Sequence, residues 1–96
     1  MKSWFDIEYV KQRVISNERI APGSHLLKVH RNHKFTAGQV IALGINTEIE
    51  PRLYSIASAE TDDLITILYS EREEGSLTQM LSLLKAGDTL LVSKPF

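Results

Sequence analysis

A cation and an aromatic ring stand two residues apart in the segment RLYSIAS at positions 52–58, as Arg52 and Tyr54. The segment has the pattern of a β-strand, on which residues i and i+2 project from one face about 6.6 Å apart. The guanidinium of Arg52 could bind a phosphate, and the ring of Tyr54 could stack on a flat heteroaromatic system. The pair therefore predicts a ligand that carries both groups.

Each of these side chains also has an ordinary structural interpretation. Tyr54 could be a core residue, because aromatic side chains on strands are usually buried. Arg52 could be a solvent-exposed cation or an ion-pair partner of Glu50 or Glu71. Strict alternation turns the side chain of Ser55 away from Tyr54, so Ser55 could reach the same ligand only through its backbone or a local distortion of the strand.

A helix is predicted over about residues 77–85, where apolar side chains recur on one helical face: Leu77, Met80, Leu81 and Leu84. Ser76 and Gln79 fit a capping box at its start. Gly75 would allow a ligand to approach the backbone closely, and the free N–H groups of a helix N-terminus attract anions. With the hydroxyls of Ser76 and Thr78, the helix start is a candidate pyrophosphate site, although most helix caps bind no ligand.

Short strands separated by turn residues account for most of the remaining chain, with expected bounds 9–20, 25–30, 39–45, 52–58, 64–69 and 89–93. Six strands with one late helix predict an all-β fold, an antiparallel barrel or sandwich whose end the helix plugs. The expected C-terminal boundary of the helix depends on Lys85 in its last turn and Gly87 just beyond it.

Length, composition and charge exclude several classes of protein. The 96 residues, 43% of them hydrophobic, fit a single domain. A net charge of −1 without a basic tract gives no reason to expect nucleic acid as a partner. The chain has no cysteine, which excludes disulfides and thiolate metal sites. No segment approaches ~18 consecutive apolar residues and the N-terminus lacks the apolar run of a signal peptide, so we expect a cytoplasmic protein with no membrane partner.

The other polar residues do not form a recognisable catalytic or metal-binding pattern. His25 and His30 would face opposite sides of one strand, and no carboxylate lies near them in sequence, so we expect no metal site. The acidic run at 71–74 is expected to be a solvated loop. No Ser/His/Asp order, paired-carboxylate pattern or GxGxxG loop is present in the sequence.

Four motifs together resemble the ferredoxin–NADP reductase superfamily, in the order FTAGQ (35–39), RLYSIAS (52–58), EGSLT (74–78) and LKAGD (84–88). The nearest resemblance is to the flavin-binding domain of bacterial ferredoxin (flavodoxin)–NADP reductases, and it extends over about residues 10–93. It implies a six-stranded antiparallel Greek-key barrel capped by one short helix, which agrees with the pattern of strands and helix above. Residues 1–96 would then form one FAD-binding barrel domain.

The resemblance also implies a role for individual residues. Arg52 would pair with the FAD pyrophosphate, Tyr54 would stack on the isoalloxazine, and Ser55 would lie near flavin N5. Tyr54 and Ser55 are therefore the candidate catalytic residues. Tyr69 would be a possible second ring beside the cofactor. The complete set of implied cofactor-binding residues is Arg52, Leu53, Tyr54, Ser55, Leu68, Tyr69, Ser70, Glu71, Gly75, Ser76, Leu77 and Thr78.

In such enzymes hydride passes from a nicotinamide to flavin N5, and electrons then leave singly to ferredoxin- or flavodoxin-type acceptors. Family members have a second, NAD(P)-binding domain after the barrel, whereas this sequence stops at Phe96. We therefore expect the FAD-binding half of an NAD(P)H-dependent oxidoreductase, with FAD ahead of FMN and with NAD(P)H bound only by a second domain or subunit. The alternatives are a stand-alone flavin carrier or electron-transfer subunit without NAD(P)H activity, and a barrel that keeps the motifs but no ligand.

Overall fold

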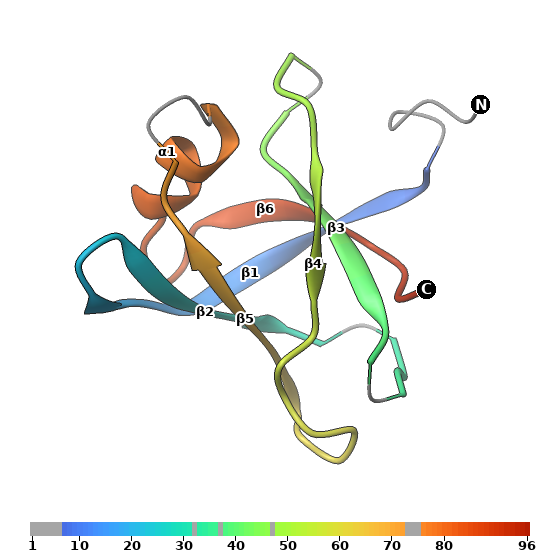
Figure 1. Cartoon of the computed structure of the whole chain (residues 1–96). Coiled ribbons are helices and arrows are strands. Elements are labelled where there is room, and N and C mark those ends of the chain that lie inside the picture. The colour runs from blue at the N-terminus through green and yellow to red at the C-terminus, as the bar shows by residue number, and fades with distance from the viewer. Residues whose placement is uncertain (1–6, 32, 37, 47, 73–75) are drawn as a thin grey trace.

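The computed structural model describes residues 7–31, 33–36, 38–46, 48–72 and 76–96. These residues form β-strands and one short helix (Figure 1). In chain order the elements are β1 (Tyr9–Ala21), β2 (Ser24–His30), β3 (Val40–Gly44), β4 (Arg52–Ser55), β5 (Leu64–Ser70), α1 (Ser76–Ser82) and β6 (Thr89–Ser93). No helix of the described residues is long and apolar enough to cross a membrane.

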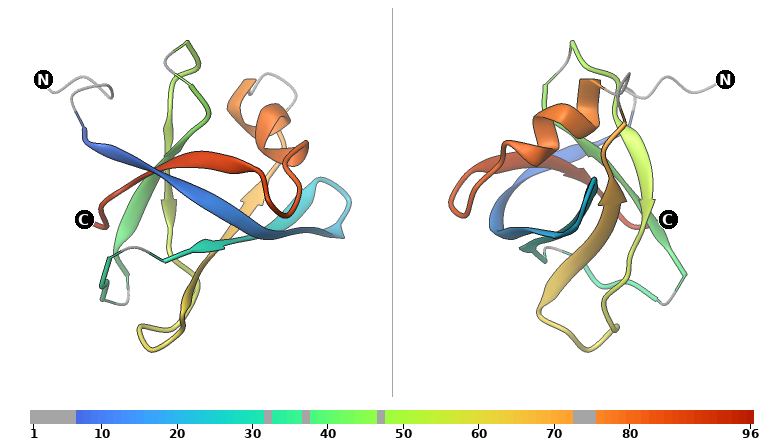
Figure 2. Two further views of the ribbon diagram at one scale, coloured as in Figure 1. Left: turned by 180° about the vertical axis from the view of Figure 1, so that it is seen from behind. Right: turned by 60° about the vertical axis from the view of Figure 1, so that its left-hand side comes forward.

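The strands form one curled antiparallel sheet in the order β4-β3-β6-β1-β2-β5. Because β6 inserts between β1 and β3, the connections have Greek-key character. The sheet curls until its two edge strands, β4 and β5, lie side by side (Figure 2). Just beyond β4 the N–H of Ala57 donates to the carbonyl of Thr66 in β5 at 2.8 Å. The predicted all-β, barrel-like fold is confirmed. The sheet is not closed, because no ladder joins β4 and β5 along the described strands.

Strand β1 is long because it serves both halves of the barrel. Its first part pairs with β6 and its second part with β2, and the register with β2 shifts just after Val14. At this point the backbone of Val14 bonds the turn before β6, since Val14 N–H donates to Asp88 O at 2.7 Å and Gly87 N–H donates to Val14 O at 2.9 Å. Gly87 has φ +95°, which a glycine adopts without strain. Gly87 therefore belongs to the turn into β6.

The predicted helix is present but shorter than expected, since α1 ends at Ser82 and not near residue 85. Its last turn tightens, because Leu83 N–H donates to Met80 O and Leu84 N–H donates to Leu81 O, both with i to i+3 spacing. Lys85 and Gly87 therefore lie beyond the helix, and their predicted roles in its last turn and at its C′ position were wrong.

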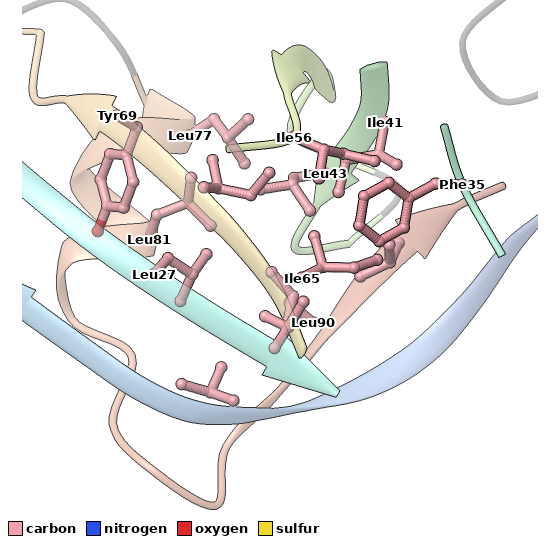
Figure 3. Packing of buried hydrophobic residues seen from close by; sticks show 14 residues of the cluster. Leu27, Phe35, Ile41, Leu43, Ile56, Ile65, Tyr69, Leu77, Leu81 and Leu90 are labelled. Carbon is pink, nitrogen blue, oxygen red and sulfur yellow. The ribbon is translucent and has the colours of Figure 1, made fainter. Parts of the chain in front are cut away.

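The interior of the barrel is filled by the inward-facing side chains of the strands together with the apolar face of α1 (Figure 3). Leu77 and Leu81 from the helix are 2% and 0% exposed, so the helix plugs one end of the barrel as predicted. Burying a leucine side chain contributes roughly 1.5–3 kcal/mol. The rest of the buried apolar cluster comprises Val14, Leu27, Val29, Phe35, Ile41, Leu43, Ile56, Ile65, Ile67, Tyr69, Leu90 and Val92.

Candidate functional site

A cavity of about 570 Å³ lies between the two edge strands β4 and β5. Its volume is in the range of small-molecule binding sites. The seam, where β4 and β5 lie side by side, is closed at one end by the hydrogen bond from Ala57 to Thr66. The cavity occupies the other part of the seam, beside the first residues of β4. The described residues that line it are Glu50, Pro51, Arg52, Leu53, Tyr54, Leu68, Tyr69, Ser70, Arg72 and Thr78.

Arg52 and Tyr54 line this cavity together, as the spacing on one strand predicted. β4 pairs only with β3 in the described sheet, where Tyr54 stands opposite Ile41. Tyr54 is half-buried because it packs against the core cluster, while Arg52 is exposed. Both interpretations of Tyr54, as a core residue and as a ligand-facing ring, therefore describe part of its surface. Ser55 is exposed at the end of β4 and is not among the described residues that line the cavity.

The hydroxyl of Tyr54 is buried and has no hydrogen-bond partner among the described residues. Burial raises the pKa of Tyr54, and the nearby guanidinium groups of Arg52 and then Arg72 act in the opposite direction. Buried polar groups almost always have a partner, so this hydroxyl is an exception within the described residues. A neutral phenol offers its proton, so the group that would satisfy it is an acceptor.

Tyr69 from β5 lines the floor of the cavity and is almost completely buried. Its ring is 3% exposed and meets Tyr54 edge to face, with centroids 6.4 Å apart. Its hydroxyl donates to Oδ1 of Asn17 at 3.1 Å. Burial raises the pKa of Tyr69 to about 12, although the hydrogen bond to Asn17 opposes this rise. Tyr69 therefore supports the Tyr54 ring from inside the barrel.

Asn17 of β1 joins this floor to the helix. Its Nδ2 group donates to the carbonyls of Leu81 at 2.8 Å and Leu84 at 3.0 Å, and its Oδ1 accepts from Tyr69. The carbonyl of Leu81 also accepts the N–H of Leu84, and Leu84 lies just beyond α1, so one side-chain amide bonds two carbonyls of the turn that ends the helix. Asn17 thereby positions the helix relative to β5, and nothing in the sequence pattern pointed to it.

His25 of β2 packs against the other side of the Tyr69 ring. The two rings are stacked with centroids 5.0 Å apart and an interplanar angle of 11°. His25 is 7% exposed, and its Nε2 lies 2.9 Å from Oε1 of Glu71. The proposed ion pair between Arg52 and Glu71 was therefore wrong, because that carboxylate contacts His25. No group of three or more potential metal ligands is found among the described residues.

The predicted phosphate site at the helix start lies only partly within the described residues. Gly75 falls outside them, and so does the side chain of Ser76. Leu77 is buried in the core, so its side chain supports the helix and does not face a ligand. Thr78 is 2% exposed, lines the cavity, and its Oγ1 accepts the backbone N–H of Arg72 at 3.0 Å.

Arg72 lines the cavity but was not among the predicted site residues, and the same holds for Glu50 and Pro51. Arg72 was grouped with three glutamates in the acidic run at 71–74 and read as part of a solvated loop. In the structure its exposed side chain lines the cavity from the β5 side, across from Arg52 on β4. The signal that could have identified it is its position, one residue after the predicted cofactor-binding stretch 68–71.

The comparisons with known proteins bear on the fold. No protein-family model and no curated protein matches this chain. Among solved structures, a ferredoxin NADP+ reductase from Neisseria gonorrhoeae with bound FAD and NADP matches with TM-score 0.84 and 22% identity, over 92% of this chain and 38% of that one. Phthalate dioxygenase reductase matches with TM-score 0.81 and 16% identity, over 99% of this chain and 32% of that one. The cytochrome b5 reductase domain of Ulva prolifera nitrate reductase matches with TM-score 0.74 and 17% identity, over 93% of this chain and 40% of that one.

These matches confirm the fold that the resemblance to ferredoxin–NADP reductases implied. The chain spans less than two thirds of the length of each of these solved structures. The likeness therefore concerns one part of larger proteins, and it shows the barrel that such proteins contain.

Proposed function

We propose that this chain binds a flavin nucleotide, FAD ahead of FMN, as the flavin-binding part of an NAD(P)H-dependent oxidoreductase. The observation that carries the proposal is the cavity between β4 and β5, which is lined by two arginines and by a tyrosine whose buried hydroxyl has no partner among the described residues. A flavin nucleotide has a flat ring, ring-edge acceptor atoms and phosphate charge, and these match the three kinds of group that line the cavity. The match to a reductase structure with bound FAD supports the same assignment.

The residues of the cavity divide into three proposed roles. Arg52 would bind the phosphates through charge-assisted hydrogen bonds, and Tyr54 would stack on the ring. Leu53 and Leu68, which are 44% and 55% exposed, would bury apolar surface against the ligand and keep water from it. A bound flavin supplies the redox chemistry, accepting hydride from a nicotinamide and releasing electrons singly.

Other predicted contacts remain part of the proposal on the strength of the resemblance. Ser55 would lie near the reactive edge of the ring, and Ser70 and Glu71 would offer mainly backbone groups along the cofactor. Gly75 and Ser76 would hold phosphate at the helix start. A second domain or subunit would bind NAD(P)H, a ferredoxin or flavodoxin would accept electrons, and a cytoplasmic location belongs to the same proposal.

Flavin titration tests the binding step. The purified chain is titrated with FAD and with FMN while flavin absorbance and fluorescence are recorded. Arg52→Ala should weaken FAD binding about 10- to 150-fold, because a lost hydrogen bond to a charged group costs about 1.5–3 kcal/mol. Arg13→Ala removes an exposed arginine of β1 outside the cavity and serves as the matched control. Absence of saturable binding by the wild type, or equal binding by Arg52→Ala, contradicts the proposal.

The redox role is tested separately with flavin-loaded protein. NADPH or NADH is added without oxygen, and the loss of flavin absorbance is followed with the chain alone and with a candidate NAD(P)-binding protein present. Reduction in either case supports an NAD(P)H-dependent role. Lack of reduction under both conditions, with flavin still bound, would favour a flavin carrier.

A further inference from the structure

We propose that Arg72 and Arg52 form an anion clamp across the open seam between β4 and β5, which selects flavins that carry phosphate over riboflavin. The inference rests on the proposed function and adds to it a second binding cation. A phosphate bridge between the two strands would take the place of the ladder that is missing at this end of the barrel.

Hydrogen bonds from the backbone N–H groups of Glu71 and Arg72 hold this segment, although it lies beyond the end of β5. The N–H of Arg72 donates to Oγ1 of the buried Thr78 at 3.0 Å. The preceding residue, Glu71, donates its N–H to the carbonyl of Gly23 at 2.7 Å. The segment is thus fixed between the β1–β2 turn and the helix, so the side chain of Arg72 starts from a defined position at the rim of the cavity.

Glu71, which precedes Arg72 in sequence, forms no ion pair with it. Oε1 of Glu71 lies 2.9 Å from Nε2 of His25, and Glu71 is not among the described residues that line the cavity. Glu50 does line the cavity, but neither Arg52 nor Arg72 forms an ion pair with any carboxylate of the described residues. Two guanidinium groups therefore line one opening, and no carboxylate of the described residues forms an ion pair with either.

Both cations act on the same buried atom. The guanidiniums of Arg52 and Arg72 each favour the charged form of the Tyr54 hydroxyl, against the larger opposing effect of burial. This hydroxyl has no partner among the described residues. One cation on β4 and one in the segment after β5 line the same cavity as an unsatisfied donor, so the cavity is positive and partly desolvated, and oxygen acceptors with negative charge complement it best.

The test compares wild type, Arg72→Gln, Arg52→Gln and Arg72→Lys, with Arg13→Gln as the surface control. Each is titrated calorimetrically with FAD, riboflavin and inorganic pyrophosphate at low and high ionic strength, and the melting temperatures establish that the variants are folded. Arg72→Gln should bind FAD and pyrophosphate at least about tenfold more weakly, with a smaller dependence on salt. Its riboflavin affinity should be unchanged, and Arg72→Lys should recover part of the loss.

The outcomes separate the clamp from the proposed function. If Arg72→Gln binds FAD as tightly as the wild type, the clamp is overturned and the proposed flavin site is unaffected. If the wild type binds pyrophosphate but no flavin, and each arginine variant loses the pyrophosphate, the clamp is supported and the flavin proposal is overturned. An equal loss of riboflavin and FAD affinity in Arg72→Gln would also overturn the clamp, because it would show a structural role for Arg72.

Discussion

Replacing Tyr54 by phenylalanine should have opposite effects on the stability of the free protein and on its affinity for FAD. The substitution keeps the ring that packs on the core and faces the cavity, and it removes only the hydroxyl. In the free protein this hydroxyl is buried without a partner among the described residues. The variant should therefore be more stable than the wild type and yet bind FAD more weakly.

The magnitudes follow from the cost of an unsatisfied buried group, which is about 1–3 kcal/mol. We take the lower end of this range and expect the free energy of unfolding to rise by about 1 kcal/mol. In the complex the wild-type hydroxyl would donate to a ligand acceptor and lose this penalty. FAD binding by Tyr54→Phe should then weaken by about 1–2 kcal/mol, which corresponds to roughly 5- to 30-fold in the dissociation constant.

Tyr69→Phe is a matched control, because its ring lies 6.4 Å from that of Tyr54 but its hydroxyl donates to Asn17. Removing a satisfied buried hydroxyl should lower the free energy of unfolding by about 1 kcal/mol, the opposite sign. Urea denaturation of the ligand-free variants, followed by far-UV circular dichroism, measures both changes. Calorimetric titration with FAD measures the affinities.

Two results would refute this reasoning. If Tyr54→Phe is destabilised as much as Tyr69→Phe, then the Tyr54 hydroxyl has a partner in the free protein. If Tyr54→Phe is more stable but binds FAD as tightly as the wild type, then the hydroxyl does not reach the ligand.

Two further predictions concern the residues that support the cavity. Burial raises the pKa of Tyr69 to about 12 from its ordinary value of 10.0. As pH rises, the unfolded chain therefore loses this proton before the folded protein does. The stabilisation that comes from the protonated Tyr69 is fully present below pH 10, and the free energy of unfolding falls between about pH 10 and 12. From pH 9 to 11 the loss from this one group is about 1 kcal/mol, so urea denaturation at the two pH values should show a smaller decrease for Tyr69→Phe than for wild type. An equal decrease would mean that Tyr69 ionises normally. Asn17→Ala removes the bonds to Leu81, Leu84 and Tyr69 and should lower the free energy of unfolding by about 2–4 kcal/mol, at roughly 1 kcal/mol for each bond plus the unsatisfied groups left behind. A loss below about 1 kcal/mol in thermal or urea denaturation would show that water replaces these bonds.

Local patterns in the chain were enough to locate most of the elements and to assign side chains to one face or the other. Alternation and turn residues located the strands to within a few residues, and the apolar stripe located the helix that plugs the barrel. Arg52 and Tyr54 could be placed together because both belong to one strand, whose two-residue period fixes their shared face whatever the strand pairs with. The opposite burial of His25 and His30 follows from the same period.

The tertiary structure decided which faces meet, because that depends on the order of strands in the sheet and not on any local pattern. Curling brings the edge strands β4 and β5 together, and only then does Arg72 come to share a cavity with Arg52. His25 and Glu71 meet across 46 residues, and Asn17 reaches the carbonyls at the end of the helix across more than 60. Such contacts leave no periodic signal in the sequence, since each is made by a single polar side chain whose partner is set by the packing of the whole barrel. The end of α1 and the support of Tyr69 were therefore beyond prediction, whereas the strand on which Arg52 and Tyr54 share a face was not.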